Sequence, residues 1–152
     1  PAPAAPATPP APAPAPVAPL EPTNVHKNLT LFHTTSRTAG LAILSSAFRP
    51  GSRGWCGGAI YFATDPEATR TKAIGLDSHQ GFMINVTVDV GKVLEADKSC
   101  FYKGKQMNCE RMVEMGYDSI AFDPGDGVEY IVCSADRVLE MHHINYTYTE
   151  YD

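Results

Sequence analysis

The chain has 152 residues, is 43% hydrophobic and carries a formal net charge of −5. A chain of this length supports one hydrophobic core rather than two. Its mildly acidic balance, without a stripe of Lys and Arg, argues against nonspecific binding along a nucleic-acid backbone.

The sequence contains no signal for membrane insertion. No apolar stretch approaches the ~20 residues of a membrane-spanning helix, and no basic segment followed by an apolar run marks a signal peptide. We therefore expect no membrane partner, while the compartment stays open. Because the chain begins with Pro1 instead of Met, we expect a fragment of a larger protein or a processed, secreted product.

The beginning of the chain differs in composition from the rest. Ten of the 13 prolines fall within residues 1–22, mixed almost entirely with alanine. Proline fixes φ and lacks an N–H donor, so a segment with this many prolines is incompatible with helix or sheet. We expect a disordered, Pro/Ala-rich linker or tail over 1–23, a folded domain over 24–145 and a C-terminal tail over 146–152.

Residue patterns within the domain predict six or seven short strands and three helices. In chain order, the predicted elements are a strand over 29–35, a helix over 37–44, a strand over 59–63, a helix from 64 to about 73, strands over 82–90 and 93–96, a helix over 107–115, and strands over 118–122, 128–133 and 137–144. This pattern predicts an α+β domain. The sequence has no G-x-G-x-x-G and no alternating βαβ run, which argues against a Rossmann dinucleotide site.

The segment 48–58 is predicted to be a loop, because it holds one proline and four glycines around Trp55. Glycine allows a backbone to approach a ligand closely. Trp55 either anchors this loop by packing or lines a cleft.

The four cysteines form no C-x-x-C pair and have no histidine at metal-ligand spacing. We therefore expect no metal site. Two disulfides would be compatible with an oxidising compartment, which the sequence leaves undecided.

Three predicted strands each carry one polar or titratable side chain among apolar and hydroxyl neighbours. They are Leu31–Ser36 with His33, Gly58–Ala63 with Tyr61, and Val128–Cys133 with Glu129. In this order they resemble the His-Tyr-Glu triad of the poly(ADP-ribose) polymerase (PARP) and diphtheria-toxin branch of ADP-ribosyltransferases. The segments 42–50 and 88–93 resemble connecting motifs of the same family, so the resemblance covers nearly all of 29–144.

The resemblance implies a short, single-domain catalytic domain with a split antiparallel sheet and about three short helices. It implies NAD as substrate and no metal. His33 would hydrogen-bond the adenosine ribose, and Tyr61 would pack on the nicotinamide ring. Glu129 would hydrogen-bond the nicotinamide ribose and oppose the positive charge of an oxocarbenium-like transition state.

Three further residues occupy family positions for nicotinamide binding, each as a departure from the usual residue. Thr34 replaces a glycine whose backbone binds the amide group of nicotinamide. Thr69 replaces a serine, and Lys72 occupies the position where a second stacking tyrosine is usual. Losing one stacked aromatic would cost roughly 0.5–1.5 kcal/mol of binding.

Each triad residue also has an ordinary structural interpretation. His33 could be a satisfied histidine in a strand, and Tyr61 could be a core residue. Glu129 could be an outward-facing acid at the first position of a strand.

The resemblance predicts a pentosyltransferase that moves a single ADP-ribose from NAD to a macromolecular acceptor. The domain is too short for the acceptor-side loop of polymer-forming members. We expect a protein acceptor, with nucleic acid left open, and a monomer. The alternatives are an NAD glycohydrolase, a catalytically inactive PARP-like interaction module, or an unrelated α+β domain.

Overall fold

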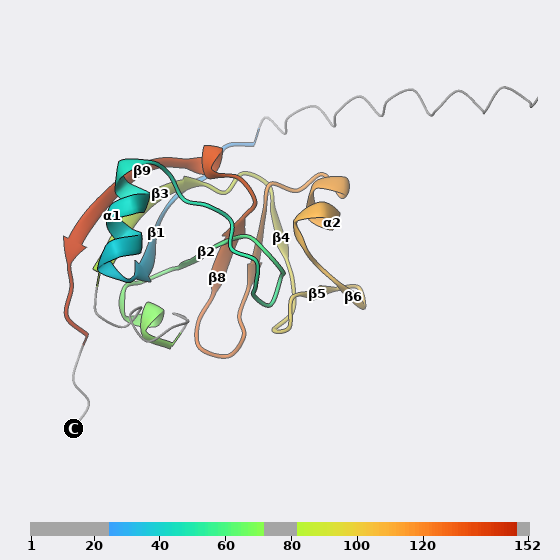
Figure 1. Ribbon diagram of the computed structural model, residues 1–152. Helices are drawn as coiled ribbons and strands as arrows, with labels where there is room; N and C mark the ends of the chain where they lie inside the picture. Colours follow the sequence, from blue (N-terminus) through green and yellow to red (C-terminus); the bar gives the residue numbers. More distant parts are fainter. Residues whose placement is uncertain (1–24, 72–81, 149–152) are drawn as a thin grey trace, which may run out of the picture.

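The computed structural model describes residues 25–71 and 82–148 (Figure 1). The predicted tail over 1–23, the expected end of the helix near residue 73, and Lys72 lie outside the described residues.

A seven-stranded sheet forms the centre of the domain. Across the sheet the order is β4 (Val93–Glu95), β7 (Ser119–Phe122), β8 (Glu129–Val132), β2 (Ile60–Ala63), β1 (Asn28–Thr35), β3 (Phe82–Asp89) and β9 (Val138–Asn145). Neighbouring strands are antiparallel except β4 and β7, which are parallel. The predicted α+β class is confirmed, with a mostly antiparallel sheet.

Two α-helices are present in the described part of the chain, one fewer than predicted. The helix α1 (Arg37–Ser45) begins directly after β1, because the Ser36 side chain accepts a hydrogen bond from the Ala39 N–H at 3.1 Å. The helix α2 (Cys109–Glu114) is shorter than predicted and lies at the other end of the sheet from α1 (Figure 1).

The helix predicted to start at Thr64 is instead a 3₁₀ helix, η1 (Glu67–Thr71), in its described part. Both the N–H and the hydroxyl of Thr69 donate to the Pro66 carbonyl, at 3.2 and 2.6 Å. A bond from residue i to i−3 is the 3₁₀ pattern, and a threonine hydroxyl that binds nearby backbone disfavours a regular α-helix. A second 3₁₀ turn, η3 (Ala135–Arg137), precedes β9.

The two parts of the sheet are joined by a short ladder between β1 and β2. The strands β1 and β2 pair at one register position, Phe32 opposite Ala63, whereas β1 and β3 pair continuously from Asn28 to Thr35. The buried apolar residues form two clusters, one around β1 and β3 and one around β7, β8 and α2. The first cluster also contains Ile60 and Phe62 of β2, so the core continues across the seam between β1 and β2.

A two-stranded hairpin, β5 (Phe101–Tyr102) and β6 (Lys105–Gln106), was not predicted, since two-residue strands leave no alternating pattern. Disulfides join Cys56 to Cys100 and Cys109 to Cys133. The first disulfide connects the glycine-rich loop to this hairpin region.

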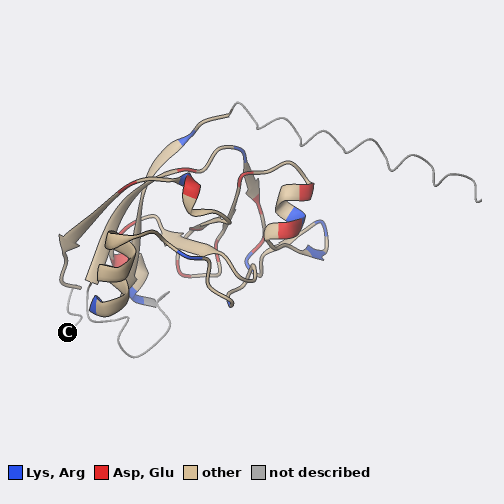
Figure 2. Cartoon of the chain, turned by 45° about the horizontal axis from the view of Figure 1, so that its top comes forward, with Lys and Arg blue, Asp and Glu red and all other residues tan. Residues whose placement is uncertain are grey.

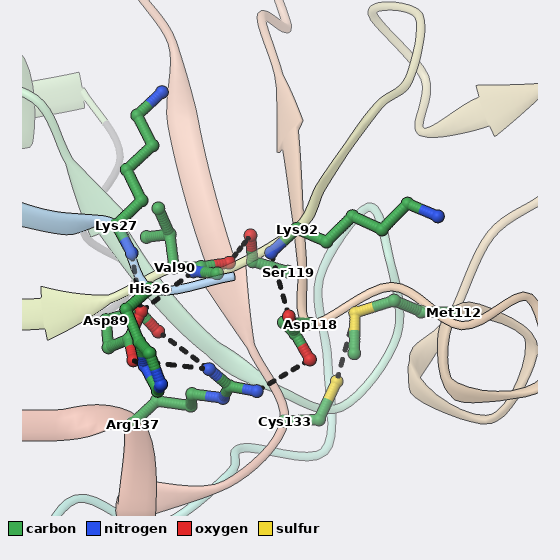
Figure 3. A network of polar contacts seen from close by, with 11 residues as sticks. His26, Lys27, Asp89, Val90, Lys92, Met112, Asp118, Ser119, Cys133 and Arg137 are labelled. Carbon is green, nitrogen blue, oxygen red and sulfur yellow. Dashed lines mark hydrogen bonds and ion pairs between the residues drawn. The ribbon is translucent and has the colours of Figure 1, made fainter. Parts of the chain in front are cut away.

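A polar network holds the Asp89 end of β3 (Figure 3). The Asp89 carboxylate accepts a hydrogen bond from the Lys27 N–H at 2.9 Å and lies 2.7 Å from His26 Nδ1. Arg137 bridges Asp89 and Asp118, with its guanidinium 2.6 Å from the Asp118 carboxylate. The contact with His26 is the largest of several that lower the pKa of Asp89.

Charged side chains of both signs are spread over the described surface, and α2 carries both (Figure 2). Within residues 25–71 and 82–148, none of the helices has the length and apolar character needed to cross a membrane.

Candidate active site

A cleft of about 1090 Å³ opens beside the seam between β1 and β2. Its walls come from β1, α1, the loop between α1 and β2, β2, η1 and the turn before β8. Among the residues that line it are His33, Thr34, Tyr61, Thr69 and Glu129. The fold thus brings together five of the six sequence-predicted site residues, while Lys72 lies outside the described residues.

His33 is held in one orientation. Its Nδ1 lies 3.0 Å from the carbonyl oxygen of Tyr61, and its ring makes edge-to-face contacts with Phe48 and Phe62 at centroid distances of 5.1 and 6.1 Å. Burial, partly opposed by the contact with Tyr61, lowers the pKa of His33 below 6.5. The imidazole is therefore neutral at neutral pH. Because a carbonyl oxygen can only accept, Nδ1 carries the proton and Nε2 is a hydrogen-bond acceptor.

Tyr61 is fixed through its hydroxyl group. The hydroxyl donates to the Gly57 carbonyl at 2.6 Å and accepts from the Cys56 N–H at 2.9 Å. Burial, with a smaller contribution from the charge of Glu129, raises the pKa of Tyr61 to about 12. The phenol is neutral and its polar atom is occupied by backbone, so the ring is the part of Tyr61 that can contact a ligand.

Gly54 explains how the loop approaches Tyr61 so closely. A Cβ at this position would overlap the Tyr61 phenol, and the Gly54 φ of 140° is one that L side chains rarely adopt. Glycine is therefore required at position 54, because a side chain would not fit there and because the backbone conformation disfavours other residues.

Glu129 opens β8 and is 7% exposed. It pairs with Ala63, which lies two residues after Tyr61 on β2, so Glu129 and Tyr61 lie on the same face of the sheet. The interpretation of Glu129 as an outward-facing surface acid is therefore wrong. A carboxylate this close to the cleft and largely shielded from water can act strongly on a nearby positive charge.

The two threonines are buried in the walls of the cleft. Thr34 is 7% exposed and Thr69 is 2% exposed. Thr34 pairs with Met83 in the ladder between β1 and β3. Thr69 lies on η1 and donates its hydroxyl proton to Pro66.

Trp55 lines the cleft and is 58% exposed. The loop is anchored next to it by the disulfide of Cys56 and by its own backbone, since the Trp55 carbonyl accepts from Gln106 Nε2 at 2.7 Å. Of the two interpretations offered by the sequence, Trp55 as a cleft residue agrees with the structure.

Sequence reasoning missed three charged residues that line the cleft: Arg49, Arg53 and Asp126. A signal for the arginines was present, because residues 28–64 contain three arginines and no Asp or Glu although the chain as a whole is acidic. Asp126, in the turn before β8, and Glu129, the first residue of β8, line the same cleft. The loop between α1 and β2 therefore contributes basic residues to the cleft, and the segment that enters β8 contributes acidic ones.

Within the described ranges 25–71 and 82–148, no group of three or more His, Cys, Asp and Glu side chains is arranged to hold a metal ion. The groups that the cleft offers to a ligand are a histidine acceptor, aromatic faces, arginines and carboxylates.

No protein-family model and no curated protein matches the chain. The chemistry of the cleft is therefore the basis for its functional interpretation.

Proposed function

We propose that the protein is an NAD-dependent ADP-ribosyltransferase with a PARP-like fold, which transfers a single ADP-ribose to a macromolecular acceptor and releases nicotinamide. The observation that carries this proposal is that His33, Tyr61 and Glu129, from three strands distant in sequence, line one cleft. Their individual geometries support three complementary roles in holding and activating NAD.

His33 would position the adenosine ribose. With Nδ1 protonated and bound to the Tyr61 carbonyl, its Nε2 is an acceptor for a sugar hydroxyl. The aromatic contacts with Phe48 and Phe62 fix the ring before substrate arrives. Such preorganisation reduces the cost of ordering the side chain on binding.

Tyr61 would offer its ring face to the nicotinamide. Because its hydroxyl is bonded to the backbone of both Cys56 and Gly57, the ring keeps its place without help from the ligand. An offset stack of two aromatic rings contributes about 0.5–1.5 kcal/mol beyond the burial of apolar area.

Glu129 would stabilise the positive charge that develops on the ribose when the bond to nicotinamide breaks. A carboxylate already fixed in a shielded site stabilises such a charge without further reorganisation. The same carboxylate can accept a hydrogen bond from a ribose hydroxyl and so orient the sugar. The bond to the acceptor then forms at the ribose carbon that nicotinamide leaves.

The distribution of charge in the cleft suits the charges of NAD. Arg49 and Arg53 line the same cleft as Glu129 and would bind the diphosphate. Glu129 would then act on the reacting ribose.

The short connection before Glu129 favours transfer of a single ADP-ribose. Only six residues separate β7 from β8. Polymer elongation needs a second binding site for the growing chain, and a turn of six residues is short for forming one.

The test is release of nicotinamide from NAD by the purified protein, with labelled adenosine to follow the ADP-ribose and a mixed protein extract as acceptor. We expect Glu129→Gln to retain the fold but to lose most turnover, because a neutral amide cannot oppose a cation. Glu95→Gln, at an exposed acid on β4, is the matched control and should retain full turnover.

The outcomes separate the candidate functions. Label that is retained on protein with the parent but not with Glu129→Gln supports the transferase. Release of nicotinamide with all label in solution would indicate a glycohydrolase, and NAD binding without release would indicate a noncatalytic module. Equal turnover by the parent and Glu129→Gln would remove Glu129 from the mechanism.

A further inference from the structure

Two tyrosines that follow β9 pack against η1. The Tyr146 hydroxyl donates to the Glu67 carboxylate. The Tyr148 hydroxyl lies 2.7 Å from Thr69 Oγ1. Although both tyrosines come from a segment that sequence composition assigned to a tail, they contact the wall of the cleft that carries Thr69.

Two ring contacts support this arrangement. The rings of Tyr146 and Tyr148 meet edge to face at 5.4 Å, and the Arg70 guanidinium lies 4.9 Å from the centroid of the Tyr148 ring. Three of the five residues of η1 therefore contact the two tyrosines: Glu67, Thr69 and Arg70.

The direction of the hydrogen bond between Tyr148 and Thr69 follows from the number of protons available. Thr69 has one hydroxyl proton, which it donates to the Pro66 carbonyl at 2.6 Å. Tyr148 must therefore be the donor to Thr69 Oγ1. A hydroxyl oxygen has two acceptor lone pairs, so Thr69 keeps one of them for an N–H group in the cleft.

The helix η1 is a 3₁₀ helix of five residues, and short 3₁₀ segments have weak internal hydrogen bonds. Its placement therefore depends on contacts with other segments. It packs against β1 and β2, and Tyr146 and Tyr148 bind its side chains from the C-terminal side of the domain.

We propose that Tyr146 and Tyr148 are positioning residues for the nicotinamide end of the site: they hold η1 so that Thr69 Oγ1 accepts a hydrogen bond from the carboxamide N–H₂ of NAD. This inference rests on the proposed function, because it takes nicotinamide as the ligand beside Thr69. It assigns to the segment 146–148 a part in substrate binding.

The test compares Tyr148→Phe and Tyr146→Phe with the full chain. Tyr148→Phe removes one O–H but keeps the ring under Arg70. Tyr102→Phe, in β5 and away from the cleft, is the matched control. Two measurements are made: hydrogen exchange of the Thr69 amide, which donates to the Pro66 carbonyl just before η1, and steady-state kinetics of nicotinamide release, which give the KM and kcat for NAD.

We expect Tyr148→Phe to speed exchange at Thr69 and to raise the KM for NAD about threefold to tenfold, the loss associated with one neutral hydrogen bond. The kcat should stay close to that of the parent, and free nicotinamide should inhibit less by the same factor. Tyr146→Phe should act in the same direction, and Tyr102→Phe should change neither quantity.

Unchanged exchange in both tyrosine variants would overturn the proposal, since η1 would not depend on these contacts. Faster exchange with an unchanged KM would overturn it too, because the contacts would then be only structural. If the parent releases no nicotinamide, the transferase proposal fails and NAD titration replaces the kinetics. Weaker binding by Tyr148→Phe would then support the positioning role, and equal or absent binding would overturn it.

Discussion

The Nδ1 atom of His33 lies 3.0 Å from the backbone carbonyl oxygen of Tyr61. The two residues stand on β1 and β2, which share only one register pair. The His33 side chain thus adds a hydrogen bond between two strands that share only a short backbone ladder, at the edge of the cleft. Because Nδ1 makes this contact, Nε2 is the imidazole nitrogen that remains for a ligand.

The lowered pKa of His33 predicts a loss of stability in mild acid. The unfolded histidine binds a proton near its ordinary pKa of 6.5, whereas the buried one binds it only at lower pH. Between these two values the unfolded state holds more protons, so the free energy of unfolding decreases as pH falls below 6.5. Above 6.5 both states are neutral and the contribution vanishes.

Chemical unfolding between about pH 5 and pH 7.5 tests this prediction. His33→Gln keeps a donor for the Tyr61 carbonyl but cannot titrate, so its stability should fall less in acid. His142→Gln, at a side chain that is 69% exposed, is the control and should follow the parent. An equal decrease in the parent and His33→Gln would contradict the assignment.

Tyr61→Phe should lower stability more than NAD affinity. The substitution leaves the Cys56 N–H and the Gly57 carbonyl without their shared partner, which costs about 1–3 kcal/mol if both stay shielded from water. The ring face remains for the nicotinamide. Tyr61→Ala should instead raise the KM strongly.

Thermal unfolding together with steady-state kinetics separates these effects. Tyr130→Phe, on the neighbouring strand β8 but not lining the cleft, controls for the loss of a tyrosine hydroxyl. A large rise in KM for Tyr61→Phe at unchanged stability would mean that the hydroxyl, not the ring, serves the ligand.

The strands of the seven-stranded sheet and five residues of the candidate cleft could be predicted from the sequence, because both leave local patterns. The alternation in β3 and the Ser36 cap of α1 depend on neighbouring residues alone, and both elements are present. Helix length was predicted less well, since the Thr69 hydroxyl in η1 binds the Pro66 carbonyl and contacts Tyr148 from the other end of the domain.

The missed parts of the site depend on distant segments. Arg49 and Arg53 belong to no motif in the sequence, and only the fold brings them into one cleft with Glu129. The contact between Tyr148 and Thr69 joins residues 79 positions apart and left no local pattern. Pairing of the cysteines likewise requires the structure, because four cysteines allow three arrangements.

Removing the disulfide between Cys56 and Cys100 should affect the site as well as stability. Cys56 supplies the N–H that binds the Tyr61 hydroxyl, so freeing the loop would loosen that ring. With a sequence separation of 44 between the two cysteines, the loss of chain constraint alone is about 4 kcal/mol.

Denaturant unfolding and the KM for NAD should therefore both change in Cys56→Ala/Cys100→Ala. In Cys109→Ala/Cys133→Ala, stability should fall with a smaller change in KM, because the contact with the Tyr61 hydroxyl comes from Cys56 and not from this pair. The same rise in KM for both pairs would indicate a general loosening of the domain instead of a specific effect on Tyr61.

Neutralising Arg49 or Arg53 should weaken NAD binding through the diphosphate. Each charge-assisted hydrogen bond contributes about 1.5–3 kcal/mol when shielded and less at an exposed site, so a rise in KM of roughly threefold to thirtyfold is expected for Arg→Gln. Both side chains are exposed, and the effect should therefore shrink as ionic strength rises.

Inhibition by free nicotinamide provides the decisive comparison for these arginines, because nicotinamide carries no phosphate. Arg49→Gln and Arg53→Gln should raise the KM for NAD while leaving the inhibition constant of nicotinamide unchanged. Arg37→Gln, an exposed arginine of α1 that does not line the cleft, is the matched control and should alter neither value. If both constants rose together in the Arg49 and Arg53 variants, the arginines would be maintaining the shape of the loop, and the basic wall of the cleft would not be a diphosphate site.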